Sequence, residues 1–311
     1  MRSSQQAIGN TPLLRAAKLG TVLGLDNLFL KYERSNPTGT QKDRVAYAHI
    51  KKAKDEGYDT VVVGSCGNYG ASIAYYASLN NMRSYVYIPK GFHSPRLSEI
   101  EKRSGAKLVL VEGKYEDSVE ASKNDAKREN WFDANAGAHP ELGLEAYAPI
   151  AKEIVDELGS VPDTVSIPVG NGTTLAGVYH GFERLKKAGQ TDRVPRIIAA
   201  STDGGNPIIY SFKNRLPHLV DFPVEKLRET EINEPLVNYH SYDGELAFLA
   251  LVESNGFAEF VTDEELSLYS EMVTKIEGLP TIPAAAASIA ATVKVARIVN
   301  VHGHHVSVLT G

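Results

Sequence analysis

The chain has 311 residues, of which 42% are hydrophobic and 23% charged, and its formal net charge is −5 at pH 7. These values are typical of a globular protein with a large core, and the negative charge disfavours nucleic acid or an anionic membrane as the partner. The first residues lack a basic segment followed by an apolar one, and no apolar run approaches the ~20 residues of a membrane span. Cys66 is the only cysteine, which excludes an internal disulfide and is typical of a reducing compartment. We therefore expect a cytoplasmic protein that does not cross a membrane.

Apolar runs rich in β-branched residues alternate with segments of helical spacing along most of the chain. The expected strands are Thr60–Gly64, Ser84–Ile88, Lys107–Val111, Thr164–Pro168, Arg196–Ser201 and Val306–Thr310. The expected helices are Arg44–Glu56, Ala71–Asn80, Pro95–Ser104, Glu116–Asn130, Glu145–Leu158, Leu175–Ala188 and Ala284–Asn300. This alternation predicts an α/β fold with parallel sheets flanked by helices. The segment Asn206–Asn238, rich in Pro, Asn and charge, is predicted to be an irregular surface loop, with a mobile cover as the alternative.

A lysine follows a turn signal near the N-terminus. Asn36–Gly39 predicts a turn, and Lys42 comes directly before a helical pattern. The positive potential at a helix start favours the neutral amine of a lysine, and an amine must be neutral to attack a carbonyl carbon. Lys42 is therefore a candidate for forming an imine; a solvated surface lysine is the alternative.

A first glycine-rich stretch, Gly64–Ser72, follows an all-apolar strand and opens a helix. Open α/β sheets bind ligands at such positions, where glycines allow close approach and free N–H groups at the helix start hold an anion. A tight turn without a ligand is the alternative. No histidine is tied to Cys66 by sequence, so we interpret this cysteine as a small packing residue.

A second glycine-rich stretch, Pro168–Thr174, also joins an apolar strand to a helix. Its two glycines and two threonine hydroxyls suit a phosphate group. It lacks both the Gly-Lys-Ser/Thr ending of a nucleoside triphosphate loop and the Gly-x-Gly-x-x-Gly pattern of dinucleotide sites.

The stretch His302–His305 contains three histidines that could suggest a metal site. No acidic or sulfur ligand accompanies them, and they flank the last predicted strand. We interpret them as a surface turn and expect no metal.

Taken in order, these features resemble the fold-type II pyridoxal phosphate (PLP) enzymes, the family of threonine synthase, cysteine synthase and threonine dehydratase. The lysine loop, Asn36–Arg44, is similar to the threonine synthase pattern Asn-Pro-Thr-Gly-Ser-Phe-Lys-Asp-Arg at most positions. The other stretches that resemble the family are Gly9–Leu13, Leu30–Glu33, Glu277–Leu279 and Pro283–Ala286. The resemblance spans nearly the whole chain.

The resemblance implies a role for each matching position. Lys42 would carry PLP as a Schiff base and move protons at the substrate Cα, and Asn68 would bind the 3′ oxygen of the cofactor. The residues Gly170, Asn171, Gly172, Thr173 and Thr174 would bind its 5′ phosphate, and Thr310 would face its pyridine nitrogen. A hydroxyl there cannot keep the nitrogen protonated as an acid would, which favours expulsion of a leaving group. Ser65, Gly67 and Tyr69 would lie in the loop around the substrate carboxylate, and Asn135 would be a further substrate-contacting residue.

Several positions that would face the substrate depart from threonine synthase. Tyr69 replaces the threonine that usually ends the asparagine loop, and the stretch corresponding to Asn-Ser…Arg has Ala136 and Glu141 instead of Ser and Arg. A carboxylate would repel a phosphorylated substrate rather than bind it.

We therefore expect a PLP-dependent lyase or synthase that eliminates or replaces a group at Cβ or Cγ of an amino acid, similar to threonine synthase but with an altered substrate pocket. Cysteine synthase-type β-replacement, serine/threonine dehydration and a catalytically silent binding protein are the alternatives; a nicotinamide dehydrogenase is disfavoured. The expected organisation is a larger PLP-binding domain, residues 1–44 and 142–311, with a smaller inserted domain, residues 45–141. The resemblance suggests a homodimer.

Overall fold

The computed structural model describes residues 8–65, 67–91, 105–300 and 302–311. These residues form two compact units, which we describe separately. Unit 1 comprises Asn36–Leu142 together with Ile8, and unit 2 comprises Gly9–Ser35 and Gly143–Gly311.

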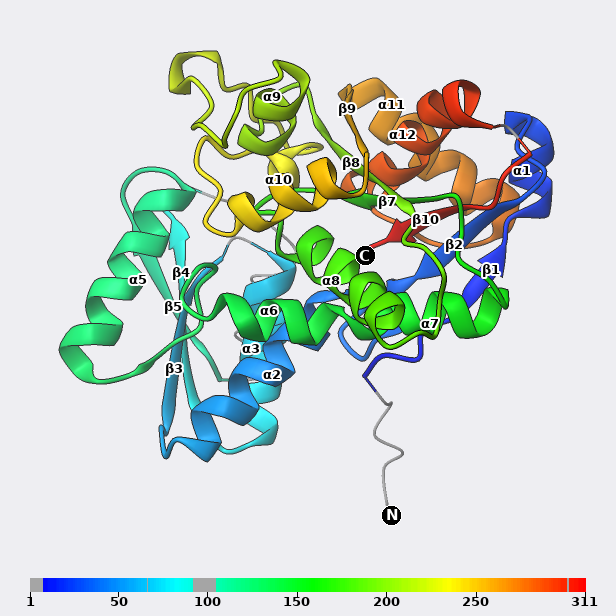
Figure 1. The fold of residues 1–311 in the computed structure, drawn as a ribbon. Coiled ribbons are helices and arrows are strands. Elements are labelled where there is room, and N and C mark those ends of the chain that lie inside the picture. Colours follow the sequence, from blue (N-terminus) through cyan, green and yellow to red (C-terminus); the bar gives the residue numbers. More distant parts are fainter. Residues whose placement is uncertain (1–7, 66, 92–104, 301) are drawn as a thin grey trace. The chain divides into compact units, whose positions relative to one another are not determined.

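Unit 1 contains a four-stranded sheet in which every pairing is parallel. The strand order is β5-β4-β3-β6, with bounds β3 (Thr60–Gly64), β4 (Arg83–Pro89), β5 (Lys107–Val111) and β6 (Phe132–Asp133). Figure 1 shows the helices α2 (Lys42–Asp55) and α3 (Asn68–Leu79) on one side of this sheet and α5 (Tyr115–Glu129) on the other. Because successive strand residues point to opposite faces, Val61 and Val63 pack with α2 and α3 while Val62 packs with Ala126 of α5.

Unit 2 contains a six-stranded sheet of order β1-β2-β10-β7-β8-β9. Its strands are β1 (Leu13–Arg15), β2 (Leu28–Tyr32), β7 (Thr164–Pro168), β8 (Arg196–Thr202), β9 (Phe257–Val261) and β10 (His305–Leu309). Only the β1–β2 pairing is antiparallel in the described part of this sheet. The carboxyl ends of β7, β8, β9 and β10 therefore lie at one edge, where the loops that follow them meet.

Helices cover both faces of this sheet (Figure 1). They are α1 (Ala17–Leu23), α7 (Pro149–Leu158), α8 (Thr173–Lys187), α9 (Pro207–Lys213), α10 (Gly244–Glu253), α11 (Asp263–Met272), a π-helical turn Val273–Glu277 and α12 (Pro283–Val299), while α6 (Pro140–Tyr147) crosses the unit boundary. The small side chains Ala284–Ala287 of α12 are almost fully buried. Ile198 of β8 and Leu28 of β2 belong to hydrophobic cores that also contain residues of α12.

The predicted α/β fold with parallel sheets and flanking helices is confirmed, and every predicted strand is present within one or two residues. Two predictions about elements were wrong. The single helix predicted over Glu145–Leu158 is two helices, because Pro149 has no backbone N–H to donate and starts the second one. The segment Asn206–Asn238 is not a plain surface loop, since it opens with α9, in which Ile208 and Ile209 are buried.

Some predictions fall on residues that the structure does not describe. The predicted helix Pro95–Ser104 lies outside the described residues, as does Cys66. Within the described ranges, no helix combines the length and the apolar character that crossing a membrane requires.

Candidate functional site

Lys42 is the first residue of α2 and follows a tight turn. The turn is closed by a hydrogen bond of 2.8 Å from the Gly39 N–H to the Asn36 carbonyl, and Gly39 adopts a φ of +82°, which glycine tolerates best. The Lys42 side chain is half-buried, and its Nζ lies 5.8 Å from the centroid of the Tyr69 ring. The turn therefore places Lys42 at the start of α2, with its amine beside the Tyr69 ring.

The residue after this lysine fixes the turn to α3. The fully buried carboxylate of Asp43 accepts hydrogen bonds from the Thr38 N–H at 2.6 Å and the Ser72 hydroxyl at 2.8 Å. Burial raises the pKa of the Asp43 carboxyl, and the hydrogen bonds from Thr38 and Ser72 oppose that rise. Sequence reasoning did not single out Asp43, although the Lys-Asp-Arg motif contains it.

The loop after β3 prepares the N-terminus of α3. Ser65 is buried and its hydroxyl accepts a hydrogen bond of 3.0 Å from the Gly70 N–H. Gly67 precedes the helix and its carbonyl accepts the first intrahelical hydrogen bond, so the N–H groups of Asn68 and Tyr69 have no acceptor within the helix. Such N–H groups suit an anion, for example a carboxylate.

Tyr69 is anchored by its hydroxyl. The oxygen lies 2.6 Å from the Ala134 carbonyl and 2.6 Å from Nδ1 of His49 on α2. His49 is 3% exposed, and burial, followed by the neighbouring His139, lowers its pKa to about 3. Its ring is therefore neutral at physiological pH. Sequence reasoning missed His49, and no local signal identifies it, because its partners come from distant parts of the chain.

The side chain of Asn135 forms hydrogen bonds within unit 1. Its side chain is 1% exposed, accepts a hydrogen bond of 2.8 Å from the Gly64 N–H, and donates to Ser122 at 2.8 Å and to Asp133 at 2.7 Å. These contacts hold the carboxyl end of β3 against α5. They indicate a supporting role for Asn135, while direct contact with a substrate stays a prediction.

The second glycine-rich turn, Gly170–Thr174, lies at the start of α8 in unit 2. Gly172 has a φ of +91°, and a Cβ there would lie 2.7 Å from the Cβ of Ala247. The first intrahelical hydrogen bond ends on the Gly172 carbonyl, so the N–H groups of Thr173 and Thr174 have no acceptor within α8. A Cβ on Gly170 would lie 2.9 Å from a backbone oxygen, so both positions require glycine.

The side chain of a buried asparagine, Asn206, stabilises this turn through hydrogen bonds. The Asn206 amide donates to the Gly170 carbonyl at 3.0 Å and to the Val169 carbonyl at 3.2 Å, and its oxygen caps α9. Sequence reasoning placed Asn206 in a loop, although an asparagine before a proline is a signal for a helix start. In the same turn, the Thr173 hydroxyl donates to Asp243 at 2.6 Å and Asn171 accepts from a backbone N–H at 3.2 Å.

Thr310 follows β10 and is 8% exposed. The next carbonyl, that of Gly311, accepts hydrogen bonds from the Ile282 N–H at 3.1 Å and the Thr281 hydroxyl at 3.0 Å. The end of β10 is therefore tied to the start of α12.

The histidines of the last turn have separate environments. His302 is exposed and lies 3.2 Å from Asp26, whereas His305 is buried in β10 and lies 2.8 Å from the Thr164 hydroxyl. Part of the predicted surface turn is thus a strand. Among the described residues, no group of three or more potential ligands could hold a metal ion.

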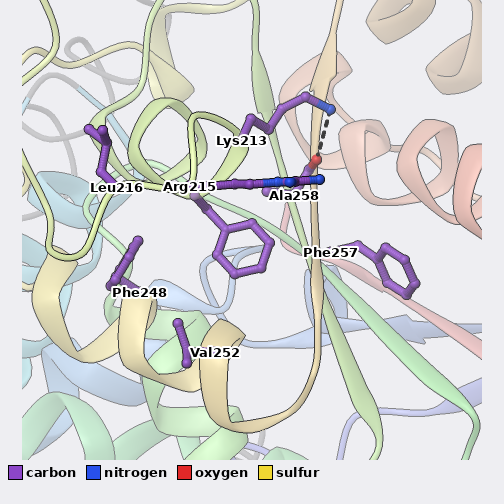
Figure 2. Close-up of a pocket in the computed structure, with 8 residues that line it drawn as sticks. Lys213, Arg215, Leu216, Phe248, Val252, Phe257 and Ala258 are labelled. Atoms are coloured by element: carbon purple, nitrogen blue, oxygen red, sulfur yellow. Dashed lines mark hydrogen bonds between the residues drawn. The ribbon is translucent and has the colours of Figure 1, made fainter.

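Unit 2 contains a hollow of about 450 Å³, and Figure 2 shows residues that line it. Its walls come from α9, α10 and β9, including Phe212, Phe248 and Val252. Lys213 lies beside it and donates to the Ala258 carbonyl at 3.1 Å. None of the predicted cofactor or substrate residues lines this hollow.

Comparisons with known proteins agree on one family. The family described as "Pyridoxal-phosphate dependent enzyme" matches residues 4–311. The threonine synthase of Methanocaldococcus jannaschii is 32% identical over 287 residues, which cover 91% of this chain and 68% of that protein. The threonine synthase of Synechocystis sp. is 32% identical over 304 residues, covering 97% of this chain and 76% of that protein.

Solved structures share the fold at low sequence identity. Maize serine racemase superposes with a TM-score of 0.81 at 20% identity, covering 97% of this chain and 88% of that one. Threonine deaminase isoform 2 of Solanum lycopersicum gives a TM-score of 0.79 at 17% identity, covering 97% and 84%. The family matches residues 4–311, and the fold is shared with these solved structures. This chain therefore belongs to the pyridoxal-phosphate dependent enzymes of fold type II.

Proposed function

We propose that this enzyme is a lyase or synthase that eliminates or replaces a group at Cβ or Cγ of an amino acid, with PLP held on Lys42. The observation that carries the proposal is the place of Lys42, the first residue of a helix, half-buried and beside the Tyr69 ring. Threonine synthases that are 32% identical to this chain support the reaction class.

The residues of unit 2 fit the phosphate of PLP. The turn Gly170–Thr174 offers N–H groups that precede the hydrogen-bond ladder of α8, at the positive end of the helix dipole. Its glycines sit where a Cβ would collide with neighbours, so the backbone conformation is fixed before any ligand binds. The Thr173 hydroxyl donates to Asp243, so backbone N–H groups, rather than this hydroxyl, are the proposed main donors.

When bound, PLP supplies an electron sink that stabilises negative charge at Cα of the substrate. Lys42 would have two roles there: its amine would hold the cofactor aldehyde, and it would take and return the proton at Cα of the substrate. The N–H groups at the start of α3, next to Ser65 and Gly67, bind and orient the substrate carboxylate. Asn68 binds the 3′ oxygen of the cofactor.

Thr310 is proposed to face the pyridine nitrogen. A hydroxyl can donate a hydrogen bond to an unprotonated nitrogen but cannot keep it protonated as a carboxylate can. With Thr310 in this role, the cofactor would be a weaker electron sink, which would favour early loss of a leaving group from Cβ or Cγ. The burial of Thr310 and the hydrogen bonds of the adjoining carbonyl support a fixed position for this hydroxyl.

Reduction with borohydride tests the cofactor assignment. Protein incubated with PLP is expected to be yellow, and borohydride should bleach it and leave a cofactor-modified peptide that contains Lys42, seen by mass spectrometry. The Lys42→Ala variant should give no modified peptide, whereas Lys51→Ala, at an exposed position later in the same helix, should behave as the wild type. A colourless wild-type protein would refute the proposal, as would labelling of another lysine.

A substrate panel tests the reaction. Serine, threonine, O-acetylserine, O-phosphoserine and O-phosphohomoserine are added in turn to the PLP-loaded protein, and the spectral change and the release of keto acid are recorded. Keto acid without any added nucleophile indicates dehydratase activity, and dependence on sulfide or a thiol indicates β-replacement of the cysteine synthase type. No spectral change with any amino acid would instead favour a catalytically silent binding protein. The homodimer expected from the resemblance and the cytoplasmic location expected from the composition stay predictions.

A further inference from the structure

The Tyr69 hydroxyl is engaged within its own unit. Its oxygen lies 2.6 Å from the Ala134 carbonyl, which can only accept, so the hydroxyl proton points at that carbonyl. The oxygen also lies 2.6 Å from Nδ1 of His49, and because its single proton is already used, Nδ1 must be the donor. The hydroxyl therefore has no proton left to offer a substrate.

The same contact assigns the tautomer of His49. With the proton on Nδ1, Nε2 carries a lone pair, and among the described residues nothing donates a hydrogen bond to it. The side chain is 3% exposed, and the centroid of the His139 ring lies 5.8 Å from its own. A second proton on this ring would be a buried charge without a partner, so the neutral Nδ1–H form is the stable one.

The anchored ring lies beside the proposed cofactor lysine. The centroid of the Tyr69 ring is 5.8 Å from Nζ of Lys42, and Tyr69 directly follows Asn68 at the start of α3. The ring is half-buried, so part of its surface is exposed to whatever binds next to Lys42. Held at its hydroxyl end, Tyr69 presents carbon atoms to this space.

We propose that His49 is a positioning residue that holds the Tyr69 ring beside Lys42, and that this ring selects amino acids with a small uncharged leaving group over those with a phosphate ester. This rests on the proposed function, because the selection takes place next to the lysine that holds PLP. A phosphate dianion loses hydration when it meets a surface of carbon atoms and gains no hydrogen bond there. A small uncharged group has a lower desolvation cost against the same ring.

The substrate preference is tested with the holoenzyme and two probes, O-acetylserine and O-phosphoserine. Kinetics give kcat/KM, and the spectral change on mixing gives the affinity, so slow turnover does not prevent the comparison. The wild type is expected to prefer O-acetylserine, and Tyr69→Thr should move the ratio of the two at least about tenfold toward O-phosphoserine. An unchanged ratio in Tyr69→Thr, or a wild type that prefers the phosphate ester, would overturn the proposal.

The role of His49 is tested with two variants that differ in one hydrogen bond. The side-chain amide of His49→Asn can donate from near the position of Nδ1, whereas His49→Leu has no donor. His49→Leu should raise KM for O-acetylserine about tenfold and change kcat less, and His49→Asn should recover most of that loss. Equal effects of the two variants would show that the hydrogen bond is irrelevant. Tyr47→Phe, which changes an exposed tyrosine on α2, is the control and should leave KM for O-acetylserine at the wild-type value.

A readout that does not depend on activity comes from NMR of isotope-labelled histidine nitrogens in the holoenzyme. His49 is expected to show the neutral Nδ1–H tautomer from about pH 5 to about pH 8. A proton on Nε2 instead would overturn the positioning role even if the enzyme binds PLP. Failure of the protein to bind PLP would refute the proposed function, and the NMR result would still decide whether His49 holds Tyr69.

Discussion

Lowering the pH should destabilise this protein through one buried histidine. His49 is 3% exposed, and burial lowers its pKa from 6.5 to about 3. The unfolded chain takes up a proton at this residue below about pH 6.5, while the folded protein does not until about pH 3. In that window the unfolded state binds more protons, so the free energy of unfolding falls as the pH falls.

The size of the effect follows from the two pKa values of His49. Linkage between them gives a loss of about 2 kcal/mol when the pH is lowered from about 7 to about 5. Asparagine does not titrate and can still donate to the Tyr69 hydroxyl, so His49→Asn should lack this part of the pH dependence. The difference between wild type and variant isolates His49 from the other titrating groups, which both proteins share.

Urea unfolding followed by circular dichroism measures the effect at the two pH values with equal cofactor content. The wild type should lose about 2 kcal/mol more than His49→Asn between them. His218→Asn, which removes an exposed histidine in the other unit, should show the full wild-type loss. If His49→Asn lost as much stability as the wild type, the lowered pKa of the buried His49 imidazole would be refuted.

Three further changes test the surroundings of the proposed site. Gly172→Ala should cost about 2–4 kcal/mol of stability and weaken PLP binding, because its φ is +91° and its Cβ would meet Ala247 at 2.7 Å; unchanged cofactor affinity on titration would contradict this. Asn135→Ala should cost about 2–4 kcal/mol by leaving the Gly64 N–H and its other partners unpaired, with little change in KM; a large rise in KM with full stability would instead indicate substrate contact. Asp43→Asn removes one acceptor from the lysine turn and should slow the binding of PLP to Lys42, measured by absorbance. An unchanged rate of PLP binding would argue against a role of Asp43 in fixing this turn.

Much of the fold could be predicted from the sequence because local pattern and tertiary structure agree. The strand Thr60–Gly64 is apolar on both faces because helices cover both, and its end is marked by the glycine that begins the next loop. The split at Pro149 was also visible in the sequence, but the helical spacing on both sides of it suggested one helix. Asn206 is a similar case. The composition of the whole segment predicts a loop, whereas its first two residues, Asn206 and Pro207, predict a helix start.

The residues of the candidate site were predictable where backbone geometry determines their role. Lys42 and Gly172 each occupy a helix start after a turn, and those positions follow from turn residues and the onset of helical spacing. The surroundings of Thr310 were less predictable, because the carbonyl that follows this buried residue is held by Thr281 and Ile282, which lie far from it in the sequence.

What Tyr69 does could not be predicted, because its function depends on two partners that no local pattern connects to it. The sequence shows a bulky residue where a threonine is usual, which indicates only an altered substrate pocket. In the structure His49 and the Ala134 carbonyl use the Tyr69 hydroxyl, so a tyrosine in place of the threonine removes a donor and adds a ring. In the proposed enzyme, substrate choice would therefore depend on a buried histidine that need not touch the substrate, and a comparison restricted to substrate-contacting positions would overlook it.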